Sequence, residues 1–281
     1  MTSPLVETAY AKINLALHVR RRRADGYHDL ESIFAFAEDG DRLEATPADT
    51  LSLTVAGPFG GALGDDPDNL VLRAARALRE AAGVGRGAAL HLDKRLPVAA
   101  GIGGGSADAA AALRLLARLW GLAGDDPRLM TIAGGLGADV PACLVSRALR
   151  GEGKGERLGL FTDSALAGMP LLLVNPRVPL ATGPVFAGWD GIDRGALDGG
   201  EPLAASRAGR NDLEPPARAL VPVIGEVVAM LAAAPGVTLA RMSGSGATCF
   251  ALFEDARARD AADRAIAAAR PGWWRLVTAL R

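Results

Sequence analysis

The sequence predicts an α+β fold with mixed layers of helix and strand, divided into two domains. The chain has 281 residues, which is enough for two domains that each bury a core. Strand-like runs and helical periodicity occur together in both halves of the chain. A polar, glycine-rich stretch at residues 151–158 is typical of a hinge, so we expect domains at residues 1–155 and 156–281.

The first half begins with strands and then turns to helices. Short alternating or β-branched runs, separated by Gly, Pro and Asp clusters, predict the strands. Asp68 or Asn69 can cap the first helix. The expected strands cover residues 7–18, 41–46, 51–55 and 88–92, and the expected helices cover residues 69–82 and 106–120.

The second half repeats the mixture of strand and helix. Residues 188–207 are rich in Gly, Asp and Ala, which predicts a long surface loop. The expected strands cover residues 170–175, 239–243 and 248–253, and the expected helices cover residues 221–234 and 255–269.

Composition favours a cytoplasmic protein that acts on a small molecule. The formal net charge of -1 offers no basic field for the phosphate backbone of a nucleic acid. Cys143 and Cys249 are too few for a disulfide framework, which favours a reducing compartment. We expect no membrane segment, because the longest apolar stretch, at residues 165–174, is about half the roughly 20 residues that a spanning helix needs.

A glycine-rich loop at Gly101–Ser106 follows a predicted strand and precedes a predicted helix. Such a loop can adopt positive φ and direct several backbone N–H groups, together with the helix dipole, at one anion. A tight turn without a ligand would have the same sequence pattern, so the loop alone does not distinguish a phosphate-binding site from a turn. It fits neither the dinucleotide fingerprint, because Ser106 takes the third glycine position, nor a Walker loop, because Gly155 follows Gly153-Lys154.

A second glycine-rich turn, at residues 241–250, lies between two apolar strand-like runs. Its Gly-Ser-Gly sequence is adequate for a β-hairpin turn, which is the simpler interpretation. The alternative is a second backbone edge facing phosphate groups.

Four polar positions and one basic run are candidates for chemistry, and each also has a structural interpretation. Lys12 and Asn14 share one face of a predicted strand, where a solvated face is the commoner explanation. Asp139 lies at a turn where an Asp is usually a helix cap, and a catalytic role would need a cation such as Lys12. His28 lies in a predicted loop, where a surface position is more common than a ligand. The basic run 20–23 is a solvated strand end or a site that attracts phosphate groups.

Six short segments follow one another along residues 9 to 248. They are Ala9-Tyr-Ala-Lys-Ile-Asn-Leu, Asp25-Gly-Tyr-His, Leu96-Pro through Asp108, Gly137-Ala-Asp-Val-Pro, Arg210-Asn-Asp-Leu-Glu and Met242-Ser-Gly-Ser-Gly-Ala-Thr. In this order they resemble the GHMP kinase superfamily, and the joint match is far more specific than any one segment. The resemblance implies an N-terminal domain like ribosomal protein S5 domain 2, a ferredoxin-like C-terminal domain and an active site between the domains.

The resemblance also implies the reaction and the residues that carry it. ATP would be the phosphoryl donor, with Mg²⁺ as its companion ion. Asp139 would take the proton from the substrate hydroxyl, and Lys12 would keep Asp139 ionised and stabilise the transferring group. The ATP phosphates would lie on the glycine-rich loop, with contributions from Pro97, Gly101, Gly103, Gly104, Gly105 and Ser106.

The Gly-Tyr-His segment resembles the branch of the superfamily whose substrate carries a cytidine diphosphate group. Tyr27 and His28 would contact the cytosine, Asn14 would position the alcohol, and Phe186 would stack on the base. Ala107 stands where the family commonly has a second serine, so one hydroxyl near the phosphates is missing. The alternatives are a GHMP-type kinase for another small sugar or isoprenoid alcohol, a non-catalytic nucleotide sensor on the same fold, and a dinucleotide-dependent oxidoreductase.

Overall fold

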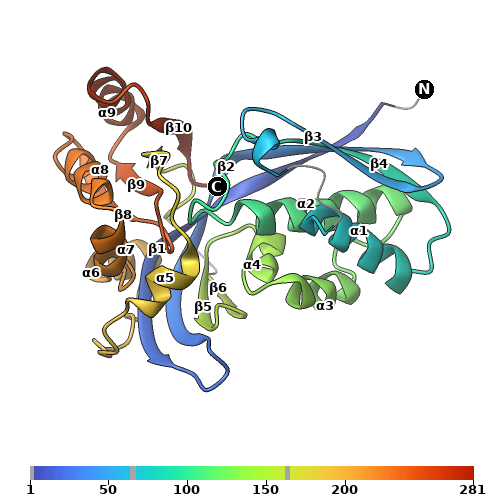
Figure 1. Cartoon of the computed structure of the whole chain (residues 1–281), viewed down its shortest axis with the longest axis horizontal. Helices are drawn as coiled ribbons and strands as arrows, with labels where there is room; N and C mark the ends of the chain where they lie inside the picture. Colours follow the sequence, from blue (N-terminus) through green and yellow to red (C-terminus); the bar gives the residue numbers. More distant parts are fainter. Residues whose placement is uncertain (1–2, 64–67, 162–164) are drawn as a thin grey trace. The chain divides into compact units, whose positions relative to one another are not determined.

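The computed structural model describes residues 3–63, 68–161 and 165–281 and contains two compact units (Figure 1). Unit 1 comprises residues 1–11, 39–98 and 103–146, and unit 2 comprises residues 12–38, 99–102 and 147–281. The units are interleaved in sequence because strands β1 (Leu5–Arg22) and β2 (His28–Ala48) each contribute to both. The sequential division at residue 155 stays a prediction, although residue 155 itself falls inside unit 2.

Unit 1 packs helices against strands that belong to a six-stranded sheet. Strand β4 (Gly87–Asp93) pairs parallel with β3 (Leu51–Ala56) and antiparallel with the end of β2. Figure 1 draws the four α-helices of this unit on one side of β3 and β4. They are α1 (Leu70–Ala81), α2 (Gly104–Trp120), α3 (Pro127–Leu136) and α4 (Val140–Val145), and a short 3-10 helix covers Gly60–Ala62.

Unit 2 contains an antiparallel sheet of strand order β10–β7–β9–β8. Helix α8 packs on β8 and β9, and α9 packs on β7, β9 and β10, which gives the ferredoxin-like arrangement that the family resemblance implies. The strands of this sheet are β7 (Pro170–Asn175), β8 (Val237–Met242), β9 (Cys249–Phe253) and β10 (Trp274–Ala279). The described helices of unit 2 are α5 (Thr182–Ala187), α6 (Pro202–Ala208), α7 (Glu214–Leu220), α8 (Val223–Ala232) and α9 (Ala256–Ala269).

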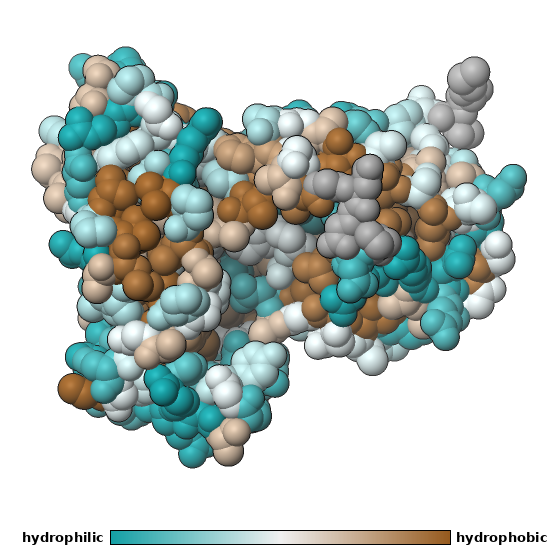
Figure 2. Space-filling model, in the orientation of Figure 1, coloured by the Kyte–Doolittle hydropathy of each residue, from teal (hydrophilic) through white to brown (hydrophobic). Residues whose placement is uncertain are grey.

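Hydrophobic residues form the core of unit 2 and also reach its surface. Leu172, Val174 and Ala251 from the sheet pack with residues of α8 and α9 in a buried cluster. In Figure 2 hydrophobic colour shows at the surface over the left-hand part, where Figure 1 draws α8, β8 and β9. No helix in the described part of the chain is long and apolar enough to cross a membrane.

Side-chain caps set several helix starts. The Asn69 side chain accepts the Val71 N–H at the start of α1, and the Asp255 side chain accepts the Ala258 N–H at the start of α9. Both caps confirm the starts predicted from the sequence. Helix α2 begins two residues earlier than predicted, at Gly104, because Gly103 adopts φ +66° at the N-cap position.

Two predictions about the strands and loops are wrong. The stretch expected to be a hinge forms a hairpin instead, with β5 (Leu149–Gly153) paired to β6 (Arg157–Leu160). Gly153 and Gly155 have φ of +73° and +106°, which permits the tight turn. Strand β2 begins at His28 rather than at residue 41. The sequence does not predict its first part, because residues 32–37 are buried on both faces and show no alternation.

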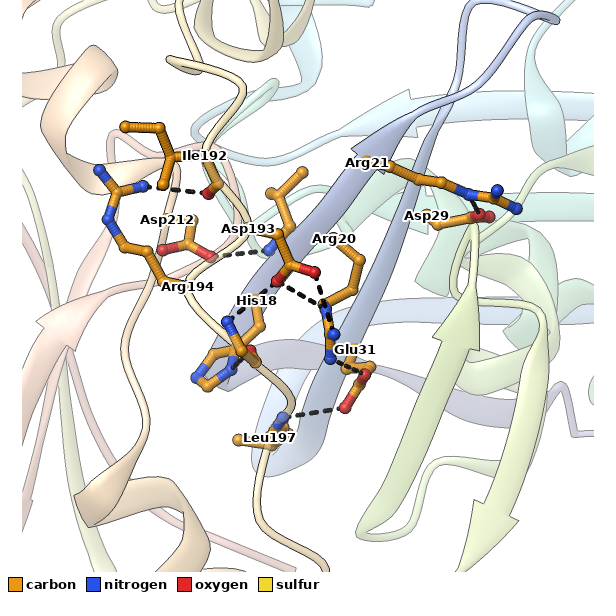
Figure 3. A network of polar contacts seen from close by, with 12 residues as sticks. His18, Arg20, Arg21, Asp29, Glu31, Ile192, Asp193, Arg194, Leu197 and Asp212 are labelled. Carbon is orange, nitrogen blue, oxygen red and sulfur yellow. Dashed lines mark hydrogen bonds and ion pairs between the residues drawn. The ribbon is translucent and has the colours of Figure 1, made fainter.

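The segment predicted as a surface loop, residues 188–207, ends in α6 and is fastened along β1 and β2 (Figure 3). The Glu31 carboxylate accepts hydrogen bonds from Arg20 at 2.6 Å, Arg150 at 2.6 Å and the Leu197 N–H at 2.9 Å. Arg20 also pairs with Asp193 at 2.9 Å. These contacts hold part of the segment against the strand that carries Lys12 and Asn14.

His18 contributes to the same attachment in its neutral form. Its Nε2 accepts the Arg210 N–H at 3.2 Å, so the proton lies on Nδ1, 3.2 Å from the Gly195 carbonyl oxygen. Burial, followed by the charge of Arg210, lowers the pKa of His18 below its ordinary value.

The lowered pKa predicts that unit 2 loses stability in acid. A proton binds His18 more readily in the unfolded chain than in the folded one. The stabilising effect of neutral His18 is therefore complete above its unfolded pKa of about 6.5, and it is lost as the pH falls toward the pKa of His18 in the folded chain. Urea unfolding between pH 8 and 5 is the measurement, and we expect His18→Gln to flatten the decline. An equally steep decline in that variant would contradict the assignment.

Candidate functional site

The two halves of the glycine-rich loop belong to different units. In unit 2, Gly101 has φ +74° and lies against the turn that joins β8 to β9. A Cβ at this position would lie 2.5 Å from the Ser243 carbonyl oxygen and 2.7 Å from that of Gly246. The Thr248 N–H also donates to the Ala100 carbonyl oxygen at 3.1 Å. Glycine is therefore required at Gly101 by both backbone conformation and space.

Strand β1 is joined to this part of the loop by hydrogen bonds. The Lys12 N–H donates to the Ile102 carbonyl oxygen at 3.0 Å. The Asn14 N–H donates to the Ser243 hydroxyl at 3.1 Å, and that hydroxyl donates to the Gly101 carbonyl oxygen at 3.0 Å. One serine thus links the strand, the loop and the second glycine-rich turn.

The second glycine-rich turn joins two antiparallel strands, as the simpler interpretation of its sequence predicts. Asn211 holds it from the other side, with its Nδ2 donating to the carbonyl oxygens of Met242 at 2.8 Å and Gly244 at 2.9 Å. The turn therefore supports the loop. That the backbone of this turn also faces phosphate groups stays a prediction.

Lys12 and Asn14 are buried, so the solvated-face explanation is wrong. Their exposed fractions are 4% and 2%. The Lys12 ammonium donates to Asn14 Oδ1 at 3.2 Å and lies 4.6 Å from the centroid of the Phe34 ring. Asn14 Nδ2 donates to the Ser32 hydroxyl at 2.8 Å, which fixes the orientation of the amide. A buried ammonium with a fixed neighbour is typical of a functional group, because burial of a charge is costly.

In unit 1, the other half of the loop forms the first turn of α2. The N–H groups at the start of an α-helix have no partner within the helix and carry the positive end of its dipole. Gly104, Gly105 and Ser106 occupy these positions. Pro97 is buried just upstream. The first turn of α2 is therefore suited to an anion such as a phosphate group.

Asp139 does not act as the helix cap that its sequence context favours. It occupies the N-cap position of α4 and is half-buried, but its side chain makes no capping hydrogen bond to the described residues of that helix. Helix α4 packs on α2, the helix that begins with the glycine-rich loop. Lys12 belongs to unit 2, and its pairing with Asp139 stays a prediction.

A pocket of about 430 Å³ lies in unit 2, and His28 is in its wall rather than on the open surface. The His28 ring contacts Phe186 with 5.0 Å between centroids, while Tyr27 is 56% exposed at the edge of the pocket. The Lys154 ammonium lies 4.5 Å from the centroid of the Tyr27 ring. Three aromatic side chains and a cation around one cavity suit a planar ligand that carries negative charge.

The protonation state of His28 follows from its surroundings. Burial, then the positive charge of Arg22, lowers the pKa of His28. The Arg22 Nε–H points at His28 Nε2, 3.4 Å away, which leaves the proton on Nδ1. The rest of the basic run makes ion pairs, among them Arg21 with Asp29 and Arg23 with Asp25.

The residues that hold the site together give no local signal in the sequence. Ser243, Ser32 and Asn211 act through long-range hydrogen bonds that leave no pattern in the chain. Asn211 and Ser243 lie in segments that resemble the GHMP superfamily, which is the signal that could have identified them. Within the described ranges, no group of three or more His, Cys, Asp or Glu side chains is placed to hold a metal ion.

Comparisons with known proteins show the family to which the sequence is similar. Residues 69–147 match the GHMP kinases N terminal domain, and residues 195–271 match the GHMP kinases C terminal family. A protein of Rhizorhabdus wittichii named 4-diphosphocytidyl-2-C-methyl-D-erythritol kinase is 66% identical over 98% of this chain and 94% of its own length. A protein of the same name from Novosphingobium aromaticivorans is 56% identical over 99% and 93%.

Two solved structures illustrate the similarity of the fold. The crystal structure of a 4-(cytidine 5'-diphospho)-2C-methyl-D-erythritol kinase matches with a TM-score of 0.78 and 35% identity, over 98% of this chain and 99% of that one. The crystal structure of homoserine kinase from Cytophaga hutchinsonii matches with a TM-score of 0.77 over 100% of this chain and 96% of that one. Its sequence identity is 18%, so this match supports a shared fold alone.

The packing at Gly101 predicts a position-specific effect of an added methyl group. We expect Gly101→Ala to lower the free energy of unfolding by about 2–4 kcal/mol, because of its positive φ and the overlap with the β8–β9 turn. Gly105→Ala is the matched control in the same loop, since its Cβ would meet only Leu70 Cδ1 at 3.5 Å. Urea unfolding measures both variants, and equal stabilities would contradict the packing described.

Proposed function

Because the chain belongs to the 4-diphosphocytidyl-2-C-methyl-D-erythritol kinases of the GHMP kinase family, we propose that it phosphorylates the 2-hydroxyl of that compound with ATP. The observation that supports the substrate most directly is the pocket bounded by Tyr27, His28 and Phe186. We further propose a cytoplasmic location, which suits an ATP-consuming enzyme with two buried free cysteines.

The glycine-rich loop is the proposed site of the ATP phosphates. Their charge would be met by the N–H groups of Gly103, Gly104, Gly105 and Ser106, with Pro97 and Gly101 shaping the connection. Mg²⁺ would enter with the nucleotide, since it usually takes only one or two protein ligands and otherwise binds phosphate oxygens and water. The Ser106 hydroxyl is an oxygen donor of the kind that this ion prefers. When bound, the ion would neutralise charge that develops on the phosphates.

Asp139 and Lys12 are the proposed catalytic residues. The substrate hydroxyl oxygen would attack the γ-phosphorus, the bond to the ADP oxygen would break, and the hydroxyl proton would pass to the Asp139 carboxylate. The Lys12 ammonium would stabilise the negative charge of the transferring group. Phosphoryl transfer has a loose, in-line transition state, so positioning and charge stabilisation contribute more than proton removal.

The pocket in unit 2 is the proposed cytosine site. The base would stack on Tyr27 and Phe186, and the His28 Nδ1–H would donate to an acceptor on its edge. Cytosine presents an unprotonated ring nitrogen where uracil presents an N–H, so a fixed donor favours cytosine. Asn14, oriented by Ser32, would position the alcohol next to Lys12.

The role of Asp139 predicts a selective loss of turnover. We expect Asp139→Asn to lower kcat by on the order of 10²–10⁴, the usual range for a general base, while leaving the affinity for ATP within about threefold. A coupled assay of ADP release measures kcat, and calorimetry with a non-hydrolysable ATP analogue measures binding. Asp126→Asn, which alters the cap of α3 in the same unit, is the control. Full turnover by Asp139→Asn would exclude the assigned role.

A further inference from the structure

A buried ionic cluster of Asp41, Lys94 and Asp108 lies in unit 1, at residues that the proposed reaction does not use. The exposed fractions of the three residues are 0%, 1% and 2%. The Lys94 ammonium pairs with Asp41 Oδ2 and, at 2.6 Å, with Asp108 Oδ2. Asp41 comes from β2, Lys94 follows β4 directly, and Asp108 lies on α2, so the cluster joins three elements.

Asp41 holds the start of the connection that leads to the glycine-rich loop. Its Oδ1 accepts the Arg95 N–H at 2.5 Å and the Leu96 N–H at 2.7 Å, while its Oδ2 accepts from Lys94. Both carboxylate oxygens are thus in use. The backbone that enters the loop is therefore fixed by one charged side chain, through charge-assisted hydrogen bonds.

Lys94 holds the other end of the connection. A Cβ on Gly104, the first residue of α2, would lie 3.1 Å from Lys94 Nζ, so the helix start rests directly on the ammonium. The lysine backbone is itself anchored, because its N–H donates to the Ala56 carbonyl oxygen at 2.8 Å and its carbonyl accepts the Phe59 N–H at 3.1 Å. Displacement of Lys94 would therefore move the first turn of α2.

The two carboxylates are not equivalent. Asp108 Oδ1 is buried and, among the described residues, has no hydrogen-bond partner. Burial raises the pKa of Asp108 to about 7, an effect that the charge of Lys94 opposes and that of Asp41 reinforces. Asp108 accepts a hydrogen bond from Lys94, whereas Asp41 accepts hydrogen bonds from the backbone of Arg95 and Leu96 as well as from Lys94.

We propose that Asp41 and Lys94 are positioning residues for ATP, which fix the spacing between the backbone at residues 95–96 and the first turn of α2. This inference rests on the proposed function, in that it takes the N–H groups of Gly104–Ser106 to bind the ATP phosphates. The residues around the cytosine pocket all belong to unit 2. Loss of the positioning residues therefore weakens ATP binding and leaves recognition of the alcohol intact.

The test compares Asp41→Asn with Asp108→Asn. An amide at residue 41 keeps an oxygen for the backbone N–H groups but turns its NH₂ toward the Lys94 ammonium. An amide at residue 108 keeps an oxygen for Lys94, and its NH₂ takes the position of the unpartnered oxygen. We expect the KM for ATP to rise by about tenfold in Asp41→Asn, with the KM for the alcohol within about twofold, and both constants to change by less than about threefold in Asp108→Asn.

Calorimetry with a non-hydrolysable ATP analogue separates this inference from the proposed reaction. Wild-type protein that binds the analogue but phosphorylates no alcohol would refute the reaction, while the analogue affinities of the variants would still decide the inference. Lys94→Arg is the second variant, used if Asp41→Asn does not fold. It keeps the positive charge but enlarges the group next to Gly104, so we expect it too to bind the ATP analogue more weakly. Unchanged analogue affinity in the folded variant, or equal rises in both KM values, would overturn the inference.

Discussion

The structure depends on the hydrogen bonds that join the middle of β1 to the glycine-rich loop. The Lys12 N–H reaches the Ile102 carbonyl oxygen, and the Asn14 N–H reaches the Gly101 carbonyl oxygen through the Ser243 hydroxyl. Because backbone groups make these contacts, the two buried side chains on the strand are held at a set distance from the loop. Glycine at residue 101 is a condition of this arrangement, since any Cβ there would overlap the β8–β9 turn.

Two buried lysines of the described site have different surroundings. In unit 2 the Lys12 ammonium donates to Asn14 Oδ1 and lies over the Phe34 ring. In unit 1 the Lys94 ammonium pairs with both Asp41 and Asp108, and an ammonium held between two carboxylates serves mainly to fix the groups around it. Burial alone does not distinguish these surroundings.

Local signals in the sequence predict the regular elements well and the site less well. The starts of α1 and α9 and the glycine-rich turn between β8 and β9 depend on neighbouring residues, so they can be predicted from the sequence. The first part of β2 does not alternate, because it is buried on both faces, and it escapes prediction for that reason. The hinge predicted at residues 151–158 is a hairpin, in which Gly153 and Gly155 supply positive φ at the turn rather than flexibility.

The candidate site is recognisable from the sequence only through its resemblance to a family. Taken alone, Lys12, Asn14 and His28 suggest exposed positions, and it is tertiary packing that buries them. Asp41 and Lys94 lie 53 residues apart in the chain, and no local pattern relates them. Contacts of this kind depend on how the elements pack, which is why they appear only in the folded chain.

Phosphorus NMR of the products tests the central claim most directly. The protein would be incubated with ATP, Mg²⁺ and either 4-diphosphocytidyl-2-C-methyl-D-erythritol or its uridine counterpart. The proposed function predicts ADP together with a new phosphomonoester on the cytidine compound, formed more slowly on the uridine compound. ADP release without a new phosphomonoester, or equal rates with the two compounds, would contradict it.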